Sequence, residues 1–131
     1  MMDFIFTFLS PEWILFFNRV VLGSAMIVYG IPKIKDLKAN AIEFSSWGFR
    51  PGMLWGTLVA LELFFGGLFI LLGFYPELFA FIMALVMIVG ILWKVKSNKP
   101  VEHLIENFHN LAMALVLISF GPGLFTIISS I

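Results

Sequence analysis

The sequence contains no cysteine among its 131 residues, and only 12% of its side chains are charged. The missing cysteines exclude disulfide bonds, cysteine-ligated metal sites and dithiol redox chemistry. Any redox reaction would therefore need a bound cofactor, a substrate or another subunit. Eight basic residues balance eight acidic ones, so we expect no long-range attraction to nucleic acid.

Hydrophobic residues make up 61% of the chain. Ordinary soluble domains are about 45–50% apolar and about 25% charged. The apolar runs reach the roughly 20 residues that a helix needs to cross a bilayer. The composition therefore predicts an all-α, polytopic integral membrane protein, with residues 1–131 forming a single transmembrane domain.

Prolines and glycines mark the ends of four apolar stretches. Ser10-Pro11-Glu12 is typical of a helix start, and Pro32 disfavours continuation of the first span. The next stretch mixes lysines with aromatic residues, which predicts a short amphipathic helix at the membrane surface. We thus expect a membrane-embedded four-helix bundle with this interfacial helix between spans 1 and 2. The predicted spans cover about residues 12–31, 52–73, 77–93 and 103–120.

The lysines and arginines outside the spans gather in two connections, at about residues 32–51 and 94–102. Cytoplasmic loops carry an excess of these residues. The distribution predicts a multi-pass cell-membrane protein with both connections in the cytoplasm and both termini outside.

Arg19 and Glu62 are ionisable residues inside apolar stretches, and each is followed by a glycine four residues later. Because lipid solvates charge poorly, we expect the two to pair. Gly23, Gly30 and Gly66 would let neighbouring helices approach closely. Two interpretations stay open: a structural ion pair, or a catalytic pair in which Glu62 handles a proton and Arg19 tunes its charge.

The fourth span begins with polar residues at helical spacing, His103, Asn107 and Asn110, beside a second stripe that includes His109. These are either the solvated first turns of a membrane helix or the polar mouth of a binding site. Under the second interpretation, the expected ligand-binding residues are Tyr29, Lys33, Trp47, Asn107, His109 and Asn110.

A metal site is not expected in this helix. Glu106-x-x-His109 has the spacing found in di-iron bundles, but those need two such motifs and two further glutamates.

The chain resembles the DoxX family through Arg19-x3-Gly23-x6-Gly30-x2-Lys33, through Glu62-x3-Gly66-Gly67, and through Gly121-Pro122-Gly123. The resemblance implies a small four-helix integral membrane protein. Relatives are often labelled oxidoreductases, and one branch is linked to thiosulfate oxidation with a quinone as acceptor. Other members are linked to membrane complexes that handle oxidative stress.

Three functions compete at this point. The first is a membrane redox protein or subunit whose apolar slot binds a quinone or lipid-like ligand near the Arg19–Glu62 pair. The second is a non-enzymatic scaffold or accessory subunit, acting through a partner membrane subunit or a homo-oligomer. The third, a small carrier, would need an oligomer to enclose a pathway.

Overall fold

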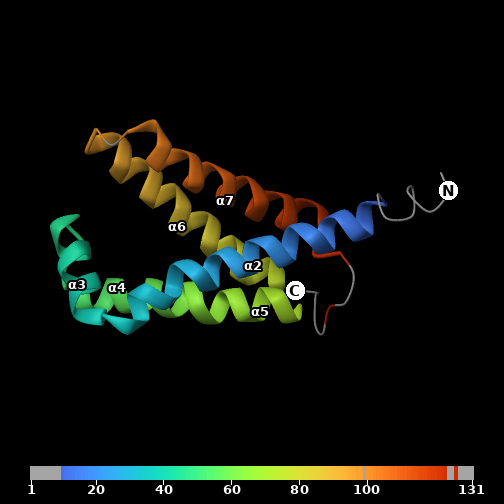
Figure 1. Ribbon diagram of the computed structural model, residues 1–131, viewed down its shortest axis with the longest axis horizontal. Coiled ribbons are helices and arrows are strands. Elements are labelled where there is room, and N and C mark those ends of the chain that lie inside the picture. The colour runs from blue at the N-terminus through green and yellow to red at the C-terminus, as the bar shows by residue number, and fades with distance from the viewer. Residues whose placement is uncertain (1–9, 99, 124–125, 127–131) are drawn as a thin grey trace.

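The structure is a computed structural model that describes residues 10–98, 100–123 and 126. Its regular elements are all helices: α2 (Pro11–Lys35), α3 (Leu37–Ser46), α4 (Gly52–Leu61), η1 (Glu62–Gly66), α5 (Gly67–Leu72), α6 (Pro76–Lys96) and α7 (Val101–Phe120). The prediction of an all-helical chain is confirmed. Helix α4, the single π-helical turn η1 and α5 follow one another without a break and form one rod (Figure 1).

Three of these rods are long and apolar enough to cross a membrane: Pro11–Lys35, Gly52–Leu72 and Pro76–Lys96. The apolar part of α7 is shorter, Leu104–Phe120. The helices cover the four predicted apolar stretches, and α2 and α6 run past the expected ends at residues 31 and 93.

Helix α2 continues through Pro32 and ends three residues later, at Lys35. Pro32 is exposed, and its carbonyl oxygen accepts a 3.3 Å hydrogen bond from the Asp36 N–H. Asp36 has left the helical conformation, and its Oδ1 caps α3 by accepting a 3.0 Å bond from the Ala39 N–H. The chain therefore turns at Asp36 rather than at Pro32.

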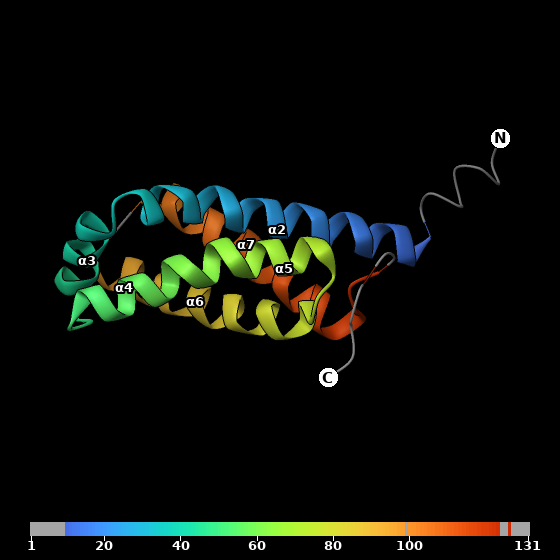
Figure 2. The same ribbon diagram turned by 90° about the horizontal axis from the view of Figure 1, so that it is seen from below.

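Helix α2 packs antiparallel to the α4–η1–α5 rod, with glycines at the crossing (Figure 2). A Cβ atom added at Gly23 would lie 2.8 Å from the Gly67 carbonyl oxygen, and one at Gly67 would lie 2.7 Å from the Gly23 oxygen. A Cβ at Gly30 would lie 2.8 Å from the Phe64 nitrogen. At Gly66 the added atom would instead meet the Glu62 side chain. Small residues let these two backbones touch.

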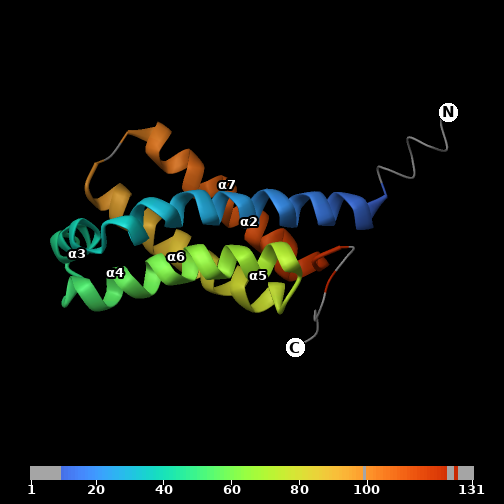
Figure 3. The same ribbon diagram turned by 60° about the horizontal axis from the view of Figure 1, so that its bottom comes forward.

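Helices α6 and α7 form a second antiparallel pair, and the core lies where this pair meets α2 and the α4–η1–α5 rod. The core consists of fully or nearly fully buried side chains from all four rods: Leu22, Met26, Leu63, Ile70, Ala80, Met83, Ala84, Ala114 and Leu117. Toward the end of the rods that carries α3, the α6–α7 pair diverges from α2 and α4 (Figures 1 and 3). That end, with residues 33–52, 93–98 and 100–102, is called the α3 end below.

Helix α3 folds back on α4 through two glycines. A Cβ at Gly52 would collide with the Ala41 carbonyl oxygen, and one at Gly56 would lie 2.8 Å from Asn40 Nδ2. Phe44 is buried on the same side of α3, whereas Ile42 is 65% exposed. One face of α3 thus covers α4.

Candidate functional site

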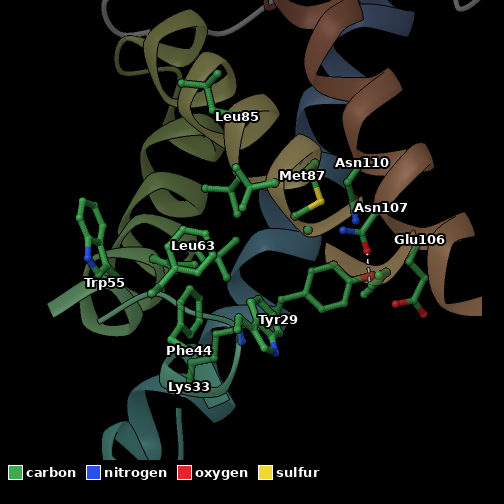
Figure 4. A pocket seen from close by; sticks show the side chains of 17 residues that line it. Tyr29, Lys33, Phe44, Trp55, Leu63, Leu85, Met87, Glu106, Asn107 and Asn110 are labelled. Carbon is green, nitrogen blue, oxygen red and sulfur yellow. Dashed lines mark hydrogen bonds between the residues drawn. The ribbon is translucent and has the colours of Figure 1, made fainter. Parts of the chain in front are cut away.

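A cavity of about 400 Å³ opens where the two helix pairs diverge at the α3 end. Its walls come from α2, α3, α4 and η1 on one side and from α6 and α7 on the other. Figure 4 shows Trp55 at one edge, Asn107 and Glu106 at the other, and Tyr29 between them. The volume falls in the range of small-molecule sites, about 300–1,000 Å³.

Most of the lining is apolar, and part of it faces outward. Val59 and Leu63 line the wall formed by α4 and η1. Trp55 on that side, and Leu85 and Val89 on α6, line the cavity while being 45%, 49% and 41% exposed. The cavity therefore has a lateral, apolar opening between α4 and α6.

The polar side of the cavity contains a lysine from α2 whose amine is hydrogen-bonded. Lys33 Nζ donates to Asn40 Oδ1 over 3.4 Å and lies 5.7 Å from the centre of the Phe44 ring. Asn40 is only 4% exposed, and its Nδ2 donates to the Gly56 carbonyl oxygen over 2.8 Å. The buried amide thus joins α2, α3 and α4 and fixes the lysine amine.

A second lysine is held in the same way from the other wall. Lys94 Nζ donates to Asn107 Oδ1 over 2.7 Å, the bond that leaves Asn107 in Figure 4. Asn107 is 8% exposed. A Cβ at Gly90 would lie 2.6 Å from Asn107 Nδ2, so this glycine allows the amide to approach α6.

Two tryptophans bridge the diverging helix pairs at the mouth. Trp47, at the end of α3, stacks on Trp93 of α6 with ring centres 4.3 Å apart and ring planes 26° apart. Phe44 packs against Trp47 at 4.9 Å between ring centres. The stack joins α3 to α6 across the space that the divergence leaves.

Arg19 and Glu62 lie outside this cavity and do not form the predicted pair. Glu62 folds over Gly66: a Cβ placed there would lie 2.8 Å from Glu62 Oε1 and 3.2 Å from the Met26 methyl. Arg19 precedes Met26 by about two turns, or about 10 Å along α2. Neither oxygen of the buried Glu62 carboxylate has a hydrogen-bond partner among the described residues.

Arg19 contacts the opposite end of the fold. It is 1% exposed, its guanidinium carbon lies 5.1 Å from the centre of the Phe16 ring, and its Nη1 lies 3.5 Å from the Pro122 carbonyl oxygen. The expected ion pair is wrong because the first turns of α2 extend beyond α5 (Figure 2), so counting residues from each helix start misjudged the relative depths.

The model of the DoxX family matches residues 14–95, which run from the start of α2 to the end of α6. The chain belongs to the DoxX family. With its apolar helices, this membership makes it an integral membrane protein. No curated protein and no solved structure matches the chain. Within this DoxX protein, α7 and Gly121-Pro122-Gly123 lie outside the matched residues.

The structure brings five of the six predicted ligand-binding residues of this DoxX protein to one cavity: Tyr29, Lys33, Trp47, Asn107 and Asn110. His109 does not line the cavity, and its side chain is exposed. Helical geometry explains the difference, since His109 is rotated by about 200° from Asn107 whereas Asn110 returns to within about 60° of it. The prediction for His109 is therefore not supported by its position.

Sequence reasoning missed several residues of the site. Asn40 and Phe44 are four residues apart in the 37–46 segment and face the same way, a signal that could have identified the inner face of α3. Lys94 was used only as an indicator of topology. Gly90 lies one helical turn before Lys94, among large side chains of α6. A glycine in such a stretch indicates a place where another helix approaches closely.

Proposed function

We propose that this DoxX protein binds a quinone or lipid-like molecule in the cavity at the α3 end and serves membrane redox chemistry as an oxidoreductase or as a subunit of one. The observation that carries the proposal is the cavity itself. It has an apolar side with exposed residues of α4 and α6, and a polar side containing Lys33 and Lys94. An amphipathic ligand matches both sides.

In this proposal all four rods cross the bilayer, with the α3 end in the cytoplasm and both termini outside. Lysines and Arg50 are concentrated in the two connections at the α3 end of the fold. The positive-inside rule assigns such connections to the cytoplasm. Helix α3 would lie at the cytoplasmic membrane surface, with Trp47 at headgroup level. Single cysteines introduced at Ser46 and at Phe120 would be unique thiols for impermeant labelling in intact cells. We expect Phe120→Cys to be labelled from outside and Ser46→Cys only after lysis.

Glu62 has a separate proposed role in proton handling. Quinone reduction consumes protons, and Glu62 is an intramembrane carboxylate whose oxygens have no hydrogen-bond partner among the described residues. Because Glu62 does not line the cavity, Glu62→Gln should leave ligand retention intact and reduce turnover in any quinone-reductase assay. Arg19 has no part in this role, since it precedes Met26, the α2 residue that packs near Glu62, by about two helical turns.

The test of the ligand site is native mass spectrometry of gently extracted protein, with Val59→Phe as the variant that fills the cavity. Val59 lines the cavity, whereas its neighbour Leu58 is 50% exposed and does not. Leu58→Phe is therefore the matched control. We expect wild type and Leu58→Phe to retain a stoichiometric quinone or lipid that Val59→Phe loses. Equal retention by the two variants would refute the site.

A non-enzymatic accessory subunit is the second candidate. The position of Arg19 favours it, because a guanidinium bound to a backbone carbonyl at the far end of α2 serves the fold rather than catalysis. Under this alternative, purified protein retains only bulk lipid, and gentle extraction recovers it with a partner membrane subunit. Glu62→Gln would then leave partner binding unchanged.

A further inference from the structure

The polar side of the cavity contains two lysines that come from opposite walls. Lys33 lies in the last turn of α2 and Lys94 in the last turn of α6. Both line the cavity. Their sequence neighbours Lys35 and Lys96 lie in the same two turns, but they are exposed and do not line it. In each of these two turns, therefore, one lysine lines the cavity and the other does not.

The bonds that orient these amines leave their charge in place. Lys33 bonds to Asn40 and Lys94 to Asn107, and an amide oxygen is neutral, unlike a carboxylate. Both asparagines are buried, and Asn40 is itself bonded to the backbone of α4. The side-chain oxygen of a neutral amide thus orients each of the two amines.

The cavity lining that the structure describes contains one carboxylate in addition to these two lysine cations. Glu106 lines the cavity but is an exposed side chain on the first half of α7. The lining residues that the structure describes therefore have one more positive than negative charge. A neutral quinone head needs hydrogen-bond donors but gains little from a net positive charge, whereas an anionic head gains from both.

We propose that the cavity binds an anionic phospholipid taken from the surrounding bilayer, with its phosphate between Lys33 and Lys94. The acyl chain leaves through the lateral opening between α4 and α6, along Val59, Leu63 and Leu85. This inference rests on the proposed function only for the statement that the cavity holds a membrane-derived ligand. It specifies the head of that ligand as a phosphate anion rather than a neutral quinone ring.

The experiment uses full-length protein in phosphatidylcholine nanodiscs, titrated with phosphatidylglycerol and read by native mass spectrometry. The double variant Lys33→Gln/Lys94→Gln is compared with Lys35→Gln/Lys96→Gln, which removes the same charge from the same two turns. Replacing a charged hydrogen-bond donor by a neutral one weakens binding of an anion by about fivefold per bond. We expect the first pair to weaken phosphatidylglycerol binding about thirtyfold and the second pair about twofold or less. Arginine at positions 33 and 94 should restore most of the affinity.

The outcomes separate this inference from the function on which it rests. Equal losses in the two double variants would overturn it, because the lipid would then respond to surface charge alone. Binding of phosphatidylcholine or a quinone as tight as phosphatidylglycerol would also overturn it. If Val59→Phe still expels that neutral ligand, the proposed ligand site survives. If Val59→Phe and Leu58→Phe retain the same molecules, both proposals fail.

Competition with free phosphate tests whether the phosphate group alone accounts for binding. Inorganic phosphate at millimolar concentration should not displace phosphatidylglycerol, because the acyl chain contributes apolar burial that a free ion lacks. Displacement by phosphate alone, at equal potency in wild type and Val59→Phe, would show a headgroup-only anion site and overturn the lipid assignment.

Discussion

Arg19 Nη1 lies 3.5 Å from the carbonyl oxygen of Pro122, although 103 positions separate the two residues in sequence. The contact ties the turn after α7 to the first half of α2. Gly123 lies in the same turn with φ +80°, and a Cβ there would collide with the Phe16 nitrogen on α2. Arg19 and the Gly121-Pro122-Gly123 motif therefore form one structural unit at the end opposite α3.

Arg19→Met tests this unit. Removing the guanidinium leaves a partly buried carbonyl without its donor, and we expect a loss of about 1–3 kcal/mol in the free energy of unfolding. The measurement is thermal unfolding in mild detergent, with Lys35→Met as the exposed control on the same helix. Ligand retention per folded molecule should be unchanged, since Arg19 does not line the cavity. An unaltered midpoint would show that the contact contributes nothing.

A double-mutant cycle of Arg19→Leu and Glu62→Leu tests the separation of these residues. Because Arg19 precedes Met26, the α2 residue that packs near Glu62, by about two helical turns, the effects of the two changes on the free energy of unfolding should add within about 0.3–0.5 kcal/mol. An ion pair would instead make the double variant much more stable than the sum of the single losses predicts. Such a rescue would show that the two side chains meet in the membrane.

Gly30→Ala tests the contact between α2 and η1. The added methyl would meet the backbone of Leu63 and Phe64, with its carbon 2.8 Å from the Phe64 nitrogen. Since backbone atoms cannot turn aside, the helices must separate, and we expect a cost of about 1–3 kcal/mol. Ser24→Ala, at an exposed position of the same helix, is the control and should change little. Equal unfolding midpoints would contradict the close approach.

Asn40→Leu tests how α3 is attached to α4. The variant removes the 2.8 Å bond to the Gly56 oxygen and the acceptor for Lys33, while keeping a side chain of similar size. We expect about 1–3 kcal/mol of local destabilisation and faster protease cleavage within residues 37–51. Lys38→Leu, on the exposed side of α3, should leave the cleavage rate unchanged. Unchanged cleavage of Asn40→Leu would refute the anchoring role.

The helical rods and most of the polar mouth could be predicted from sequence. Apolar run length is a strong signal, and Pro11, Pro76 and Gly73 lie at the ends of helices, as expected. Asn107 and Asn110, predicted to lie on one stripe of the helix, both line the cavity, because helical spacing fixes which side chains share a face. These features depend on local geometry alone.

The prediction of an Arg19–Glu62 pair failed because pairing depends on how far one helix is shifted along another, which the sequence does not give. Glycine positions indicated that α2 and the second rod touch, but not that Gly23 would meet Gly67 and Gly30 would meet Phe64. One partner of Arg19 is the Pro122 carbonyl, and a backbone carbonyl is present at every residue, so the sequence does not indicate it. The role of Asn40 was hidden for a related reason, since its acceptor is the backbone of Gly56.

The π-helical turn at Glu62–Gly66 has a consequence for chain length. Such a turn is an α-helix with one extra residue, accommodated by a local i to i+5 bonding pattern. A chain with one residue fewer between Leu61 and Gly67 could close the same rod as continuous α-helix, leaving Gly56 and Gly67 against α3 and α2. A DoxX sequence with a one-residue gap at this point can therefore keep the same helix crossings and the same connecting loops.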